Sequence, residues 1–183
     1  MLFRSSKRPI VKIEDIKGLK IRTMQNPICI DMFNTLGANA TPLPMPEVFT
    51  ALEQKTVDGQ ENPARTIEAS KIYEVQKYMT LTRHMYNPMA LMMSKKTWDK
   101  SKPADQKIVA EALTRATMKS IDEAKALDEQ SMKAMEKKGI KVFRYSEAQL
   151  VPIAKAVAAS WPKLEGKMTK ELISEFRKNL APK

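Results

Sequence analysis

The chain has 183 residues, of which 43% are hydrophobic, and its formal net charge at pH 7 is +11. This length suffices for a domain with a buried core, and 5 Gly and 11 Pro are too few for a low-complexity chain. The 32 Lys and Arg are dispersed among 21 acidic residues, which favours a solvated basic surface over a nucleic-acid footprint. The single cysteine, Cys29, excludes an intramolecular disulfide, and the residues after Met1 hold no apolar run long enough for a signal peptide or membrane span.

The first part of the chain predicts a strand followed by a helix. Apolar and polar residues alternate over residues 19–23, which indicates a strand that runs into a turn at Asn26. Residues 27–36 place their apolar side chains at helical spacing, and Gly37 predicts the end of that helix. Cys29 lies on this helix, where we expect a small buried hydrophobic residue rather than a reactive thiol.

The following elements predict an open α/β sheet. Several prolines within residues 41–46 exclude a central strand and indicate an edge or cleft-lining segment. Residues 47–55 predict a short helix. We interpret residues 57–63 as a strand-to-helix connection, in which Gly59 allows a positive-φ turn and Pro63 opens the next helix. Strands and helices that alternate in this way are typical of an open α/β sheet.

Two polar residues of this region form a plausible binding pair. Arg22 ends the first predicted strand, and Asn62 lies on the connection just described. A planar guanidinium can hold both oxygens of a carboxylate, and a carboxamide N–H can donate to the same group. The pair therefore predicts a site for a small carboxylate in the cleft at the strand ends. The alternative is that Arg22 is only an exposed arginine at the end of a strand.

The middle of the chain predicts a further helix and two strands. Residues 63–73 continue helically, and residues 78–82 return as a strand. The only histidine, His84, has no cysteine or second histidine nearby, so we expect a structural hydrogen bond rather than a zinc site or a catalytic base, with ligand contact as the less favoured alternative. The continuous apolar run of residues 89–93 predicts a strand buried in a sheet.

The last part of the chain predicts a long helix. Residues 103–138 carry an apolar stripe at helical spacing that ends at Gly139. Because the stripe does not keep strict heptads, it indicates a scaffold helix rather than a coiled coil or partner helix. A strand is expected at residues 140–143, and helices at 150–163 and 169–180, with a capping start at Ser146. Trp161 is expected to pack in the core or against the other lobe rather than to stack on a ligand.

Several motifs follow one another in an order and spacing that resemble a known family. They are Ile16-Lys17-Gly18-Leu19-Lys20-Ile21-Arg22, Leu36-Gly37-Ala38, Thr41-Pro42, Glu47-Val48-Phe49-Thr50-Ala51-Leu52, Val57 to Pro63, Tyr73 to Tyr78, Met93 to Trp98 and Ala104 to Lys107. In this combination the chain resembles the solute-binding proteins of TRAP (tripartite ATP-independent periplasmic) transporters. Members of that family are longer and have two α/β lobes, so the chain resembles only their C-terminal portion.

The resemblance implies an α/β fold, a periplasmic-binding-protein-like (type II) lobe with a long C-terminal scaffold helix and with the N-terminal lobe largely missing. Residues 1–87 would form the first part of lobe II, and residues 88–127 would belong to lobe I and the inter-lobe long helix. Residues 128–183 would complete lobe II. An apolar strand made for a missing sheet exposes its edge, so we expect the chain to self-associate.

The resemblance also implies an extracytoplasmic solute-binding protein, here a fragment of a periplasmic receptor. It would bind a small organic acid, such as a C4-dicarboxylate or a sugar acid, and deliver it to the membrane subunits of a TRAP transporter. Arg22 and Asn62 would hold the ligand carboxylate, Gln25 and Met45 would border the rest of the ligand, and Arg4, on a strand that crosses between lobes, is a further candidate. No cofactor, metal or nucleic-acid partner is expected.

Other classes of function are less well supported. An enzyme would need a nucleophile with a base, a metal cluster or a cofactor loop, and the sequence has no GxGxxG, P-loop, HExxH or GxSxG motif. Asp58 and Glu61, the nearest paired carboxylates, are more plausibly structural. The remaining alternatives are a truncated, non-functional relic and a basic protein that binds polyanions or nucleic acid without specificity.

Overall fold

The computed structural model describes residues 2–5, 8–85, 89–159, 169, 171, 174 and 175, and for residues 2–5 and 159 only the backbone. The described part is an α/β domain built on one six-stranded sheet in the order β3-β2-β4-β1-β5-β6. This confirms the expected open α/β sheet. The strands are β1 (Leu2–Ser5), β2 (Lys20–Thr23), β3 (Asn39–Pro42), β4 (Gly59–Asn62), β5 (Tyr78–Leu81) and β6 (Lys141–Arg144).

Strand direction divides the sheet into two parallel parts. β3, β2 and β4 run parallel to one another, and β5 and β6 form a second parallel pair. β1 lies between β4 and β5 and is antiparallel to both. As expected from its prolines, the segment around Pro42 is an edge strand.

The described residues also form six α-helices and three short 3-10 helices. The α-helices are α1 (Pro27–Thr35), α2 (Val48–Glu53), α3 (Ala64–Ala69), α4 (Lys95–Lys100), α5 (Pro103–Lys137) and α6 (Glu147–Ala159). The 3-10 helices are η1 (Ile13–Ile16), η2 (Met45–Glu47) and η3 (Ile72–Glu74).

Local sequence signals account for where several helices begin and end. The Asn26 side chain accepts a hydrogen bond from the Ile28 N–H at 2.9 Å, so it caps α1, and Gly37 follows that helix with a φ of 85°. At the start of α6, Ser146 and Gln149 form a reciprocal capping box: the Ser146 N–H donates to Gln149 Oε1 at 3.0 Å, and the Gln149 N–H donates to Ser146 Oγ at 3.4 Å. Both starts were predicted from the sequence.

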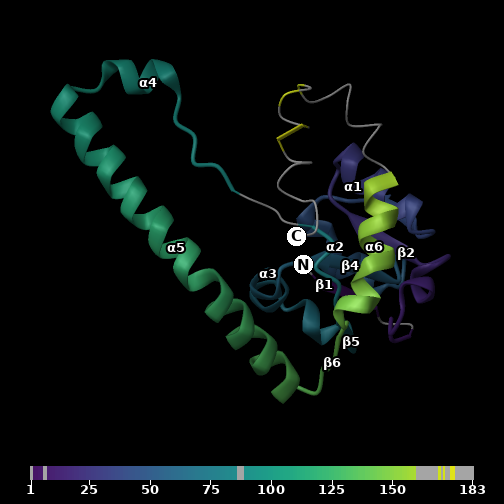
Figure 1. Cartoon of the computed structure of the whole chain (residues 1–183). Helices are drawn as coiled ribbons and strands as arrows, with labels where there is room; N and C mark the ends of the chain where they lie inside the picture. The colour runs from purple at the N-terminus through teal and green to yellow at the C-terminus, as the bar shows by residue number, and fades with distance from the viewer. Residues whose placement is uncertain are drawn as a thin grey trace.

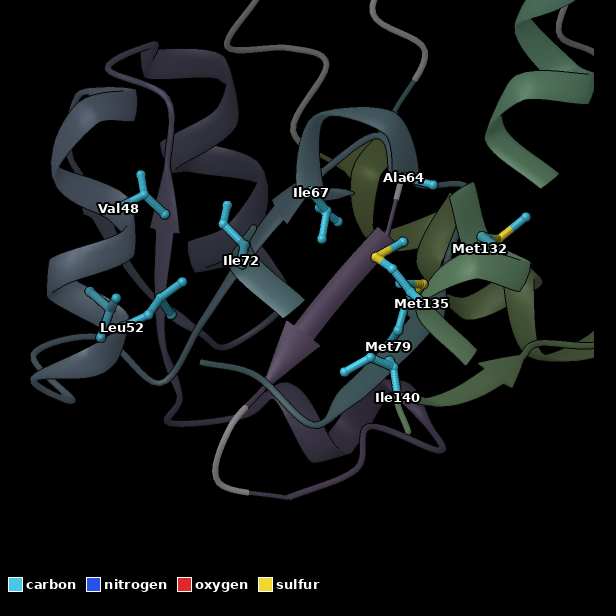
Figure 2. Close-up of a cluster of buried hydrophobic side chains, with 10 residues drawn as sticks. Val48, Leu52, Ala64, Ile67, Ile72, Met79, Met132, Met135 and Ile140 are labelled. Atoms are coloured by element: carbon cyan, nitrogen blue, oxygen red, sulfur yellow. The ribbon is translucent and has the colours of Figure 1, made fainter. Parts of the chain in front are cut away.

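Two hydrophobic clusters lie on opposite faces of the sheet. The first cluster brings together α2, α3 and the last turns of α5 (Figure 2), with members Val48, Leu52, Val57, Ala64, Ile67, Ile72, Met79, Met132, Met135 and Ile140. The second cluster packs under α1, and its members are Ile10, Ile16, Leu19, Ile21, Met32, Phe33 and Ala38. Val157 of α6 also packs on the second cluster.

The long helix α5 is packed at one end only. Its buried residues are Ser131, Met132 and Met135, all near the C-terminal end. The rest of the helix runs away from the sheet, with α4 at its far end (Figure 1). Four apolar side chains on this projecting part are 40% to 64% exposed: Ile108, Leu113, Met118 and Ile121. The predicted scaffold helix is therefore present, and within the described residues its N-terminal part has an uncovered apolar surface.

Three expectations from the sequence are wrong. Residues 89–93 are irregular instead of a buried strand, with Met89 94% and Met92 91% exposed, because no described strand offers them a pairing partner. Gly59 is not in a positive-φ turn; it is an extended residue of β4, paired with Ser5 and Ile21. The helix after Pro63 also ends early, at Ala69, because Lys71 adopts a left-handed φ of 53° before η3 begins.

Two expectations lie outside the described residues. They concern Trp161 and most of the predicted helix over residues 169–180. The predicted helix after residue 150 is described as far as Ala159.

Candidate functional site

The side chain of Arg22 is buried at the carboxyl end of β2. Only 3% of the residue is exposed, so it is not an ordinary surface arginine at a strand end. Its Nε and Nη2 donate hydrogen bonds to the carbonyl oxygen of Leu43, at 2.8 and 2.6 Å. These bonds use one edge of the guanidinium plane. A guanidinium can hold a carboxylate in a bidentate pair through either of its two edges, and the edge formed by Nη1 and the second Nη2 proton is the one that is not turned toward Leu43.

The electrostatic surroundings of Arg22 suit an anion. Burial lowers the pKa of Arg22 from its usual value, and the negative charge of Glu61 opposes that shift. A guanidinium nevertheless stays protonated at physiological pH. Arg22 is therefore a desolvated cation, and an anion that reaches it interacts more strongly than it would with a solvated arginine.

Asn62, at the end of β4, belongs to a second polar group. Its Nδ2 donates to Oε1 of Gln60 at 2.6 Å and lies 4.0 Å from Sδ of Met45. Gln60 is in register with Arg22 on the neighbouring parallel strand. Since side chains alternate along a strand, Arg22, Gln60 and Asn62 lie on the same face of the sheet.

These contacts bring three of the predicted site residues to one place. Arg22 and Asn62 lie at the carboxyl ends of neighbouring parallel strands. Met45 begins η2, two residues after Leu43, whose carbonyl accepts the hydrogen bonds of Arg22, and its sulfur lies 4.0 Å from Nδ2 of Asn62. The carboxyl ends of parallel strands are where open α/β sheets place their ligands. The arrangement offers a buried cation and a carboxamide donor beside a partly buried thioether.

Gln25 and Arg4 are less closely tied to this group. Gln25 is exposed in the turn between β2 and α1. The backbone of Arg4 lies in β1, in register with Gln60 on β4, while its side chain is outside the described part of the structure. The strand expected around Arg4 is thus confirmed, and its contact with a ligand stays a prediction, as it does for Gln25.

Glu61 points to the opposite face of the sheet, where it meets His84. Oε2 of Glu61 lies 3.6 Å from Nε2 of His84, and both side chains are almost fully buried. Nδ1 of His84 is 2.7 Å from the Thr82 hydroxyl, and the Phe33 ring stands edge-on to the imidazole at 5.5 Å. Burial lowers the pKa of His84, against the opposing effect of Glu61, so the imidazole is neutral at pH 7. The expected structural hydrogen bond of His84 is present.

Cys29 and Asp58 also have the structural roles expected from the sequence. Cys29 is buried, and burial raises the pKa of its thiol to about 11, so it remains an unreactive thiol at neutral pH. Oδ2 of Asp58 accepts a hydrogen bond from the Lys20 N–H at 2.9 Å, and the Asp58 N–H donates to the Lys20 carbonyl at 2.8 Å. Asp58 thereby joins the starts of β2 and β4.

Two residues of this polar group, Leu43 and Gln60, were not predicted from the sequence. The Leu43 carbonyl leaves no trace in the sequence, because any residue could supply it. Gln60 could have been found from the sequence, because it stands two positions before Asn62, and this spacing in a strand places both side chains on the same face. That signal was hidden by the interpretation of Gly59 as a turn.

Across the described ranges, no group of three or more His, Cys, Asp and Glu side chains could hold a metal ion. No helix in that same part of the chain is long and apolar enough to cross a membrane.

The fold is that of one lobe of an α/β binding protein. Residues 1–167 match the family described as bacterial extracellular solute-binding protein, family 7. The chain belongs to this family, whose members are solute-binding proteins of transport systems.

Individual relatives agree with this assignment. A solute-binding protein of Verminephrobacter eiseniae is 38% identical over 170 residues, which are 92% of this chain and 51% of that protein. The sugar acid binding protein of Advenella mimigardefordensis, solved in complex with galactonate, superposes with a TM-score of 0.88 at 37% identity, over 95% of this chain and 56% of that one. A TRAP periplasmic solute-binding protein of Polaromonas, bound to D-erythronate, gives a TM-score of 0.87 at 37% identity, over 95% and 57%. The chain therefore spans about half the length of the relatives it matches.

Proposed function

We propose that this chain carries the carboxylate-binding lobe of a periplasmic receptor that delivers a small organic acid to the membrane subunits of a TRAP transporter. The observation that carries the proposal is the burial of Arg22, which keeps one guanidinium edge on the Leu43 carbonyl. Buried charges in proteins are usually paired, and among the described residues no carboxylate forms an ion pair with Arg22, so a bound anion is a partner that would fit it.

In the proposed complex the ligand carboxylate accepts two parallel hydrogen bonds from the free edge of Arg22. Asn62 donates to the same carboxylate with its second Nδ2 proton, which leaves its weak contact with the Met45 sulfur when the ligand binds, and Met45 borders the carbon chain. The two solved relatives hold galactonate and D-erythronate, both hydroxylated carboxylic acids. A sugar acid of this kind is accordingly the ligand class we favour.

We further propose that residues 1–87 and 128–183 form this lobe and that residues 88–127 belong to the other lobe and the long inter-lobe helix. The uncovered apolar side chains of α5 and of residues 89–93 support this division, since a soluble protein rarely leaves such a surface open. The share of the relatives that the chain does not match, 43% to 49%, is large enough for a second lobe, which would enclose the ligand and complete its contacts.

A thermal shift experiment on the 183-residue chain tests the proposed ligand class. One lobe alone should bind D-galactonate no better than about 1 mM, because the carboxylate stays partly hydrated. At about 50 mM ligand this affinity stabilises the fold by about 2.3 kcal/mol, or about 5–9 °C in Tm. Galactitol, the neutral polyol, and sodium chloride at the same ionic strength are the controls. An equal shift with galactitol would show that the carboxylate is not recognised.

A further inference from the structure

Gln60 is fully buried in β4, and its carboxamide has a single hydrogen bond among the described residues. Its exposed fraction is 0%, its Oε1 accepts from Nδ2 of Asn62 at 2.6 Å, and its Nε2 has no partner in that part of the chain. A buried donor without a partner is unfavourable, so the orientation of this side chain needs a reason.

The contacts of Asn62 supply that reason. Its Nδ2 faces two acceptors, the Gln60 carbonyl oxygen and the Met45 thioether sulfur at 4.0 Å. Rotating the Gln60 carboxamide alone would set donor against donor and break the bond. Rotating both carboxamides would restore a bond but would turn Oδ1 of Asn62 toward the Met45 sulfur, acceptor against acceptor. The observed orientation is the one that keeps one Asn62 amide proton on the Gln60 oxygen and the other on the side of Met45.

The pairing of β2 with β4 places Gln60 next to Arg22 of the proposed site. Gln60 is paired with Arg22 across β2 and β4, so a carboxylate on Arg22 lies beside the side chain that Gln60 orients. A carboxylate accepts hydrogen bonds and cannot donate them. Asn62 helps to bind it only while it presents N–H, and presenting its carbonyl oxygen would repel the ligand.

We propose that Gln60 is a positioning residue: it holds one N–H of the Asn62 carboxamide, so that the other N–H, on the side of Met45, is presented to the ligand carboxylate. This inference rests on the proposed function and adds a residue that never touches the ligand. Its contribution to binding is preorganisation, because the carboxamide need not lose rotational freedom when the ligand arrives.

The test is Gln60→Met in the ¹⁵N-labelled 183-residue chain, with D-galactonate as the probe. The change keeps the length of the side chain and replaces the amide oxygen, a strong acceptor, with a thioether sulfur, which accepts hydrogen bonds only weakly. We expect about fivefold weaker galactonate binding, the size of one hydrogen bond, and faster solvent exchange of the Asn62 side-chain amide protons. The Asn62→Asp variant has no side-chain amide at this position, so the two NMR signals missing from its spectrum are assigned to the Asn62 side-chain amide protons.

The matched control is Thr80→Val on β5. Thr80 is 1% exposed, and its hydroxyl donates to the Ile10 carbonyl at 2.8 Å, so the change removes a buried hydrogen bond elsewhere in the same sheet. Galactonate affinity and Asn62 exchange should stay unchanged in this variant. Equal losses in Thr80→Val and Gln60→Met would mean that general destabilisation is responsible, and would overturn the inference.

Two further outcomes separate this inference from the proposed function. If Arg22→Lys weakens binding while Gln60→Met does not, the role of Gln60 is overturned and the carboxylate site stands. If Arg22→Lys leaves the affinity unchanged, the proposed function fails and the role of Gln60 fails with it. If the Gln60→Met variant does not fold, the inference can still be tested on the unmodified chain. The side-chain amide protons of Asn62 should exchange with solvent more slowly than those of the exposed Asn26. Equal exchange rates would refute the hydrogen bond between Asn62 and Gln60.

Discussion

Replacing Arg22 by lysine keeps the charge and tests the geometry of the guanidinium. Arg22 holds the Leu43 carbonyl through Nε and Nη2 and leaves the Nη1 edge for a ligand. A lysine ammonium is one compact centre, which cannot hold the carbonyl and also donate two parallel bonds to a carboxylate.

The expected size of the effect follows from the bonds lost. Losing one charge-assisted hydrogen bond to the ligand costs about 1.5–3 kcal/mol, which at about 1.4 kcal/mol per factor of ten weakens binding by at least tenfold. In the 183-residue chain an affinity near 1 mM would therefore weaken to about 10 mM or more. The free energy of unfolding should also fall, by about 1–3 kcal/mol, because Leu43 loses part of its anchor.

The assay combines an NMR titration with D-galactonate and urea unfolding of the free protein. Arg144→Lys is the matched control, because Arg144 is an exposed strand arginine that pairs with Glu136 at 3.2 Å. That change should alter the free energy of unfolding by less than about 1 kcal/mol and leave binding as it was. Unchanged galactonate affinity in Arg22→Lys would remove Arg22 from the site and refute the reasoning.

Three further predictions follow from the structure. The free energy of unfolding should decrease as the pH falls below 6.5, the usual pKa of histidine, because His84 binds a proton in the unfolded chain more readily than in the folded one, where burial lowers its pKa. Urea unfolding measured from pH 7 to 5 should show this decrease, and the decrease should vanish in the His84→Gln variant. Met135→Ala, at a fully buried position, should cost about 2–5 kcal/mol, whereas Met92→Ala, at a position 91% exposed, should cost less than about 0.5 kcal/mol in the same unfolding assay. The chain should self-associate through its exposed apolar residues, and replacing Ile108 and Ile121 with glutamine should shift sedimentation toward the monomer; a wild-type chain that is already monomeric would contradict this.

The sequence predicted those parts of the fold that depend on local signals. α1 begins after the expected turn at Asn26 and ends before Gly37, and Ser146 starts α6, because turn and cap residues act within a few positions of the chain. Residues 89–93 were assigned wrongly because an apolar run shows only that burial is favourable. Whether a strand forms depends on a partner strand, which the described part of the chain does not offer them.

The site could be predicted only in part, for a related reason. Arg22 and Asn62 have side chains suited to a carboxylate, and the structure places them on neighbouring strands. The hydrogen bond to the Leu43 carbonyl and the proposed orienting role of Gln60 depend on how the ends of β2, β3 and β4 pack together. No local sequence pattern predicts that packing. The identity of the acid depends on contacts with the rest of the ligand, which a single lobe does not supply.

Two-dimensional NMR of the ¹⁵N-labelled chain is the most direct test of the carboxylate site. Spectra are recorded during parallel titrations with D-galactonate and galactitol, and the Arg22 Nε–H and Asn62 side-chain signals are followed. Both sets of signals should shift with galactonate, saturating in the millimolar range, and neither should shift with galactitol. Shifts that are equal for the two compounds, or that occur only at surface lysines, would contradict a carboxylate site at Arg22 and Asn62.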